Sequence, residues 1–139
     1  MNDKEIIEFL LTRGIDSKKD LRIGLIGPLG IGKTELVKKL LFAISRDLGK
    51  SVHSPTFNIC NIYSSNQLKV YHFDLYRIEN EEQLFDIELW ECMDNNKDLV
   101  IIEWVDMFSD IMENCDINIS IQEDNEGVRL YSILETEIK

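Results

Sequence analysis

The sequence predicts an α/β fold: a mixed β-sheet with parallel strands at its core, antiparallel hairpins at its edges and helices on both faces. Three observations lead to this fold class. An apolar run at 21–26 is followed by a glycine-rich loop and then by helical periodicity over 33–48. A continuous apolar run at 99–102 is typical of a central strand buried on both faces. Two pairs of strand-like segments, within 57–74 and 117–134, are each joined by turn-forming residues.

The N-terminal third predicts two helices and a strand. Residues 4–11 are mostly apolar, and we expect a helix there, followed by a polar connector over 13–20. The apolar run at 21–26 predicts a short buried strand. We expect one helix over 33–48, because apolar residues recur there at helical spacing and Gly49 is a natural helix stop.

The middle third combines a hairpin with acidic helical segments. Segments 57–63 and 68–74 read as strands, and the turn-rich residues 64–67 between them predict an antiparallel hairpin. We expect helical segments with an acidic face over 79–93, followed by a turn at 94–96.

The last third completes the sheet. The run at 99–102 predicts a central strand, and the isoleucines of 117–121 alternate with polar residues, as in a half-buried strand. Residues 124–127 turn the chain, and 128–134 return it, so the last two strands form a C-terminal hairpin.

Composition and charge indicate one globular domain, which we expect to span residues 1–139. No apolar run approaches the length of a membrane span, and the charged N-terminus does not suit a signal peptide, so we expect a cytoplasmic protein with no membrane contact. The net charge of −11 argues against a large phosphate-backbone footprint on DNA or RNA. Solubility is an equally good explanation of the acidity. The three cysteines lack metal-ligand spacing, and we expect reduced thiols.

Residues 27–34 carry the pattern of a phosphate-binding P-loop. Such a loop wraps backbone N–H groups around a phosphate, its lysine neutralises phosphate charge and its threonine hydroxyl ligates Mg²⁺. The strand before it and the helix after it supply the required context. The sequence therefore predicts a P-loop NTPase-like sheet, with nucleotide-binding residues Gly27, Gly30, Ile31, Gly32, Lys33, Thr34 and Glu35. The alternative is a glycine-rich turn that binds nothing.

Two acidic residues, Asp74 and Glu103, end apolar strands. Ligands of open α/β sheets bind beyond the carboxyl ends of the strands. An acid there can hold Mg²⁺, or it can orient the water that attacks the γ-phosphate. Spacing alone leaves open which of the two does which, and an ordinary ion pair or cap is the alternative for each.

Two further segments contain candidate residues. Thr56, in Ser54-Pro55-Thr56-Phe57, has a hydroxyl that could reach Mg²⁺ or a γ-phosphate as switch loops do, although such a segment is more often a plain turn. His72 we expect to be structural, because phosphoryl transfer gives it little to do.

Taken in order, these residues resemble the TsaE family, the small ATPases of tRNA threonylcarbamoyladenosine biosynthesis. The resemblance covers roughly residues 24–106 and rests on the P-loop, Ser-Pro-Thr-Phe at 54–57, His-Phe-Asp-Leu-Tyr-Arg at 72–77 and Ile-Glu-Trp at 102–104. The sequence departs from the family pattern at Pro28, Ile31, Glu35 and 105–106, and it lacks the usual Leu-Gly pair near 87–88.

The resemblance implies Mg²⁺-dependent ATP binding and slow hydrolysis, with TsaB- and TsaD-like partners that carry out the transfer to tRNA. The protein itself would reach tRNA only through those partners. By motif, the resemblance assigns phosphate and Mg²⁺ binding to Lys33 and Thr34, a second Mg²⁺-site role to Asp74, and the catalytic acid to Glu103, with Trp104 beside it. Thr56 would be the switch-like residue.

Two other functions fit the same residues. A small P-loop kinase would need an acceptor pocket and usually a lid with several arginines, and arginine supply here is thin. A nucleotide-gated binding module would order its Thr56 loop toward a partner and hydrolyse little.

Overall fold

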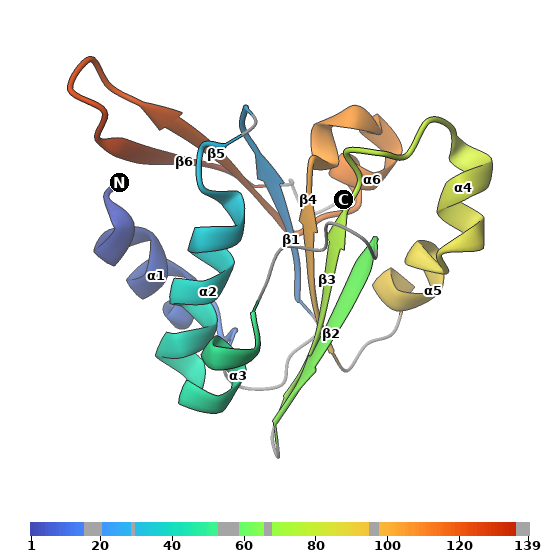
Figure 1. Cartoon of the computed structure of the whole chain (residues 1–139), viewed down its shortest axis with the longest axis horizontal. Helices are drawn as coiled ribbons and strands as arrows, with labels where there is room; N and C mark the ends of the chain where they lie inside the picture. The colour runs from blue at the N-terminus through green and yellow to red at the C-terminus, as the bar shows by residue number, and fades with distance from the viewer. Residues whose placement is uncertain (16–20, 29, 53–58, 66–67, 95–97, 136–139) are drawn as a thin grey trace.

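The computed structural model describes residues 1–15, 21–28, 30–52, 59–65, 68–94 and 98–135. Within them the chain forms a six-stranded sheet of order β2-β3-β4-β1-β5-β6 (Figure 1). The strands are β1 (Leu21–Ile26), β2 (Cys60–Ser64), β3 (Lys69–Asp74), β4 (Leu99–Glu103), β5 (Ile117–Glu123) and β6 (Arg129–Glu135). The four inner strands are parallel, and β2 and β6 pair antiparallel at the two edges. The predicted mixed sheet with antiparallel edges is confirmed.

Helices cover both faces of this sheet, as predicted (Figure 1). On one face lie α1 (Asp3–Thr12), α2 (Lys33–Ile44) and α3 (Arg46–Ser51). On the other lie α4 (Glu81–Asp86), α5 (Leu89–Asp94), the 3₁₀ turn η1 (Val105–Met107) and α6 (Ser109–Glu113). Strand β4 is buried along its whole length because helices cover both faces of the sheet. Its alternate residues point to opposite faces, so Leu99 and Ile101 join one core and Val100 and Ile102 join the other.

Helix α1 is fixed at its start by polar contacts. Asn2 and Glu5 form a reciprocal capping box, with Oδ1 of Asn2 accepting from the Glu5 amide at 2.9 Å and Oε1 of Glu5 accepting from the Asn2 amide at 3.0 Å. Asp3 forms an ion pair with Lys39 of α2, and the Met1 amino group donates to the Tyr131 carbonyl at 3.0 Å. These contacts attach the N-terminal segment to both α2 and β6.

The predicted single helix over 33–48 is wrong in one respect: it is broken at Ser45. That residue is extended (φ −157°, ψ 131°) and separates α2 from α3. Gly49, expected as the stop, lies inside α3. A Cβ on Gly49 would come within 2.2 Å of the Phe42 ring, so the missing side chain is what lets the two short helices pack closely.

The predicted half-buried β5 is also corrected. Asn118, expected on a solvent face, is buried, because η1 and α6, which the sequence reading did not identify, cover that face. Its Nδ2 donates to the Met112 carbonyl at 3.0 Å, and its Oδ1 would lie 2.1 Å from a Cβ on Gly24 of β1. The glycine in β1 therefore makes room for the buried Asn118 side chain of the neighbouring strand.

The sheet positions the candidate site at one end. Strands β1, β3 and β4 run parallel, so their carboxyl ends meet at the same edge, the upper one in Figure 1. In register, Glu103 lies between Leu25 of β1 and Asp74 of β3. No helix in the described ranges is long and apolar enough to cross a membrane.

Candidate functional site

A pocket of about 300 Å³ opens at this edge, between the start of α2 and the ends of β3 and β4. The predicted site residues that line it are Gly30, Gly32, Lys33, Thr34, Glu35, Asp74, Glu103 and Trp104; Arg129 of β6 lines it as well. Gly27 and Ile31 do not line the pocket. Thr56 and its neighbours 53–58 lie outside the described residues.

The loop at 27–34 has the backbone that its glycines allow. Gly30 and Gly32 have φ of +78° and +107°, a region that side chains with a Cβ rarely adopt. A Cβ on Gly27 would meet the Ile31 side chain at 2.9 Å and the Ile121 carbonyl at 3.1 Å. Ile31 itself is buried in the core, so only its backbone is available to a ligand. These observations fit a cradle of backbone N–H groups that a phosphate could enter.

Lys33 brings a cation into the pocket. Its Nζ donates to the carbonyls of Gly27 (2.7 Å) and Pro28 (2.9 Å) and lies 4.1 Å from the centroid of the Trp104 ring. Burial lowers the pKa of Lys33, while the nearby carboxylates of Glu103, Asp74 and Asp106 act in the opposite direction.

Trp104 is held in an unusual backbone conformation. It is left-handed (φ 61°, ψ 33°), one of two non-glycine residues with positive φ in the described ranges. Its amide donates to the Leu25 carbonyl at 3.0 Å, and its ring lies 4.8 Å from that of Tyr76, tilted by 41°. A left-handed non-glycine residue costs about 1–2 kcal/mol. Strain of this kind often marks a functional site, and here it places the indole over Lys33.

The two strand-end acids differ in their surroundings. Asp74 is half-buried, and its Oδ1 accepts from the amide of Tyr76 at 3.0 Å. Burial raises its pKa, partly opposed by that hydrogen bond, and the neighbouring Glu103 raises it further. Glu103 is only 4% exposed, and one oxygen, Oε2, accepts from Oγ1 of Thr34 at 2.9 Å and contacts Nε2 of His72 at 2.5 Å.

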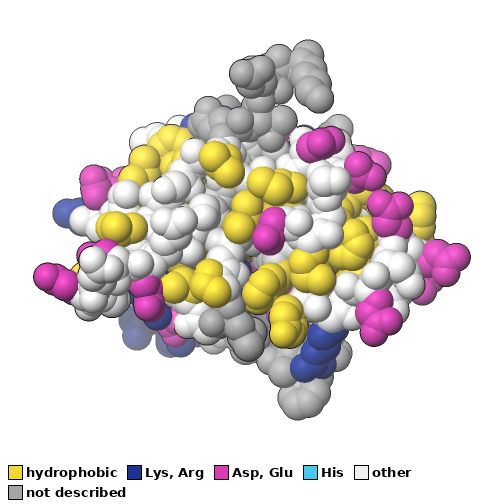
Figure 2. All heavy atoms as spheres, turned by 90° about the horizontal axis from the view of Figure 1, so that it is seen from above, with side chains coloured by type: hydrophobic (Ala, Val, Ile, Leu, Met, Phe, Trp, Pro, Cys, Tyr) yellow, Lys and Arg dark blue, Asp and Glu magenta, His cyan; other side chains and the backbone are white. Residues whose placement is uncertain are grey.

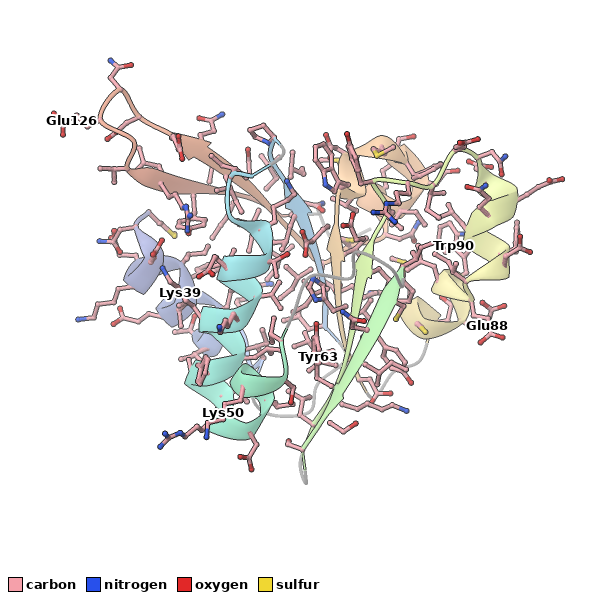
Figure 3. All side chains as sticks on the ribbon, viewed as in Figure 1. Lys39, Lys50, Tyr63, Glu88, Trp90 and Glu126 are labelled. Carbon is pink, nitrogen blue, oxygen red and sulfur yellow. The ribbon has the colours of Figure 1, made fainter. Side chains whose placement is uncertain are left out.

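Behind Glu103 a line of polar side chains runs into the protein. Nδ1 of His72 lies 2.9 Å from the hydroxyl of Tyr63, which in turn accepts from Nδ2 of Asn61 at 3.5 Å. Tyr63 projects from β2 toward the interior (Figure 3). The sequence predicts a structural His72, whereas Tyr63 and Asn61 belong to no recognisable motif. The alternation in β3 does place His72 and Asp74 on one face, but only the pairing of β3 with β4 shows that Glu103 shares it.

Arg129 also lines the pocket, although no motif in the sequence predicts it. Its guanidinium lies against Gly32, so close that a Cβ there would be 2.6 Å from its Cζ. The residue begins β6, two strands from the P-loop strand. Its approach to the loop follows from the strand order, which no local motif reveals.

The oxygens at the pocket suit a hard cation shared with a ligand. In the described part of the chain, no three His, Cys, Asp or Glu residues are grouped so as to hold a metal alone. Mg²⁺ usually takes only one or two protein oxygens and completes its shell with phosphate and water. Thr34, Asp74 and Glu103 supply such oxygens.

Comparison with known proteins gives a consistent result. The sequence model described as "Threonylcarbamoyl adenosine biosynthesis protein TsaE" matches residues 3–131. A Rickettsia typhi protein named tRNA threonylcarbamoyladenosine biosynthesis protein TsaE is 30% identical, over 95% of this chain and 90% of that protein. The protein of the same name from Rickettsia felis is 29% identical over 78% of this chain, a match that spans 61% of the relative.

Solved structures show the same fold. Bacillus subtilis YdiB aligns with a TM-score of 0.65 over 99% of this chain and 82% of its own, at 21% sequence identity. The family match over residues 3–131 includes the motifs at 27–34, 72–77 and 102–104. The chain belongs to the TsaE family of threonylcarbamoyl adenosine biosynthesis proteins.

Proposed function

We propose that this protein binds ATP with Mg²⁺ and hydrolyses it slowly, in support of the threonylcarbamoyladenosine modification of tRNA. One observation carries the chemical part of this proposal: the hydroxyl of Thr34, at the start of the P-loop helix, is hydrogen-bonded to Glu103, with Asp74 next to Glu103 in register. Family membership supports the pathway. The family resemblance supports TsaB- and TsaD-like partners in the cytoplasm.

The residues divide the work by position. The loop amides and Lys33 hold the phosphates and offset the charge that develops during phosphoryl transfer. Thr34 and Asp74 hold the metal, which when bound neutralises phosphate charge. Glu103 orients the attacking water. We assign the metal to Asp74 rather than to Glu103 because Asp74 is the more exposed carboxylate, whereas Oε2 of Glu103 already accepts from two side chains.

The charge of the molecule supports indirect contact with tRNA. The chain carries a net charge of −11. Figure 2 looks onto the end of the molecule where the pocket lies, and the side chains visible there are mainly acidic and apolar, with basic ones at the margins. Tight binding to an RNA backbone rests on lysine and arginine. The proposed role is therefore that of an ATPase that serves a partner complex.

The Lys33→Ala variant tests the site. We expect ATP affinity and hydrolysis to fall at least about tenfold, because one charge-assisted contact to phosphate is lost. Lys50→Ala is the matched control: Lys50 is exposed on α3, away from the pocket (Figure 3). If the Lys33 variant binds and hydrolyses ATP at the parent level, the site assignment is wrong.

Hydrolysis measured with and without the TsaB–TsaD pair and tRNA tests the role. Stimulation by the pair supports the proposal. ATP binding without stimulated turnover would favour a nucleotide-gated binding module. Phosphoryl transfer to a metabolite faster than hydrolysis would favour a small kinase, although Arg129 is the single arginine among the described residues that line the pocket.

A further inference from the structure

We propose that His72 is the positioning residue for Glu103: its imidazole carries a proton on Nε2, donates it to Oε2 of Glu103, and is held in that tautomer by the hydroxyl of Tyr63 at Nδ1. The proposal rests on the proposed function in one respect, that Glu103 orients the attacking water. The arrangement of hydrogen bonds stands apart from that role and can be tested alone.

Burial and short distances both indicate that Tyr63, His72 and Glu103 are hydrogen-bonded in series. His72 has no exposed surface, and Tyr63 and Glu103 are 3% and 4% exposed. Buried polar groups of this kind are almost always hydrogen-bonded, and an unpaired one is costly. The contact between Nε2 of His72 and Oε2 of Glu103, at 2.5 Å, is shorter than an ordinary hydrogen bond to a carboxylate, so the two groups are in direct contact.

Donor and acceptor counting sets the tautomer. A carboxylate only accepts, so the imidazole nitrogen that faces Glu103 must carry the hydrogen. Nδ1 of a neutral imidazole is then an acceptor, and the hydroxyl of Tyr63 at 2.9 Å can donate to it. Asn61 donates to the same hydroxyl oxygen at 3.5 Å, so in the proposed arrangement Tyr63 accepts from Asn61 and donates to Nδ1 of His72.

His72 and Thr34 differ as partners of Glu103, although both contact Oε2. Thr34 lines the pocket, and its hydroxyl oxygen is the atom that we assign to Mg²⁺; that oxygen would use a lone pair for the metal while its hydrogen still points at Oε2. His72 is fully buried, does not line the pocket and has no ligand assigned to it. Its contact with Glu103 therefore serves to orient the carboxylate and not to bind a ligand.

Kinetics of three variants test the proposal. His72→Leu removes the donor at similar bulk, His72→Gln restores an amide donor near the place of Nε2, and Tyr63→Phe removes the hydroxyl from Nδ1. We expect kcat of His72→Leu to fall about 10- to 100-fold while KM for ATP changes less than about twofold, because a misplaced catalytic group lowers the rate rather than the binding. His72→Gln should recover most of this loss. Tyr63→Phe should fall in between.

Controls separate positioning from general structure. Tyr71→Phe removes a hydroxyl from the opposite face of β3 and should leave kcat unchanged. In a Glu103→Gln background, His72→Leu should cause no further loss of kcat, since both act through one carboxylate. Thermal unfolding of each variant shows that it is folded.

Nitrogen-15 NMR of the imidazole provides a readout that does not depend on hydrolysis. We expect the shifts of a neutral ring with its hydrogen on Nε2, a change at Nδ1 in Tyr63→Phe, and a change at Nε2 in Glu103→Gln. A ring with its hydrogen on Nδ1 and a bare Nε2 would overturn the proposal, as would a folded His72→Leu with parent kcat. If instead Glu103→Gln itself keeps full hydrolysis, the proposed role of Glu103 fails, and the NMR result still decides the hydrogen bonding.

Discussion

Asp74 and Glu103 end neighbouring parallel strands as register partners, yet their surroundings differ. Asp74 is half-buried and its side chain accepts from the backbone of Tyr76, whereas Glu103 is buried and accepts from two side chains. The extra methylene of glutamate lets its carboxylate reach Thr34 on α2 and His72 on β3 together. The comparison shows that the end of a strand supplies a carboxylate, while its neighbours decide whether the carboxylate is fixed or available to a ligand.

The largest effect should follow from neutralising Glu103, the buried acid. Glu103→Gln keeps the size of the side chain but removes its negative charge, and we expect partner-stimulated kcat to fall about 10²–10⁴-fold, the usual range for loss of a general base. ATP affinity, from fluorescence or calorimetric titration, should stay within about threefold. A variant that hydrolyses at the parent rate would reverse the division of roles between the two acids.

The second largest effect should follow from neutralising Asp74, the more exposed acid. With Asp74→Asn we expect the Mg²⁺ concentration needed for half-maximal hydrolysis to rise about tenfold or more, because a hard cation prefers a charged oxygen ligand. Excess Mg²⁺ should restore much of the rate, unlike in Glu103→Gln. A rate loss in Asp74→Asn that no Mg²⁺ concentration repairs would remove the distinction between the two carboxylates.

A smaller effect should show whether the phosphate-binding part of the pocket includes Arg129 of β6. We expect Arg129→Ala to weaken ATP binding about 3- to 10-fold, since its guanidinium lies against Gly32 at the pocket and can offset phosphate charge. Arg46→Ala, on the exposed start of α3, is the control. Equal affinity of the two variants would limit the phosphate site to the loop and α2.

The smallest effect concerns stability. Burial raises the pKa of Asp74, so the folded protein binds a proton there more tightly than the unfolded chain does. The charged form of Asp74 therefore lowers the stability of the folded protein. This loss grows as the pH rises from the pKa of Asp74 in the unfolded chain through its higher pKa in the folded protein. We expect Asp74→Asn to raise the Tm at neutral pH by roughly 2 °C, and the difference from the parent to vanish in acid. A lower Tm at neutral pH would contradict this.

Much of the fold could be predicted from periodicity. Strand β1 has the expected bounds, and β3 and β4 differ from expectation by one residue, because an apolar strand between two helical layers leaves a clear sequence pattern. The break at Ser45 could not be predicted, since it depends on the packing of Phe42 against Gly49. Glu88, near the place where the family usually has a Leu-Gly pair, has a positive φ of 57°, a conformation that glycine adopts most readily, and single-residue periodicity did not predict it.

The site could be predicted only where a local motif contains it. The residues of 27–34 and the strand-end acids were found in this way, and the structure brings Lys33, Thr34, Asp74 and Glu103 around one pocket. The contacts of His72 and Arg129 depend on which strands are neighbours and on their register. Those properties are set by long-range packing, which a single sequence does not display.

The indole of Trp104, which a left-handed backbone holds against Lys33, also provides an optical probe. The chain has two tryptophans, and the other, Trp90, lies on α5 away from the pocket (Figure 3). A Trp90→Phe variant would leave a single indole, 4.1 Å from the ammonium group of Lys33. Any nucleotide that draws this cation toward its phosphates would change the electric field at the ring. Emission from an unlabelled protein would then follow nucleotide arrival in real time.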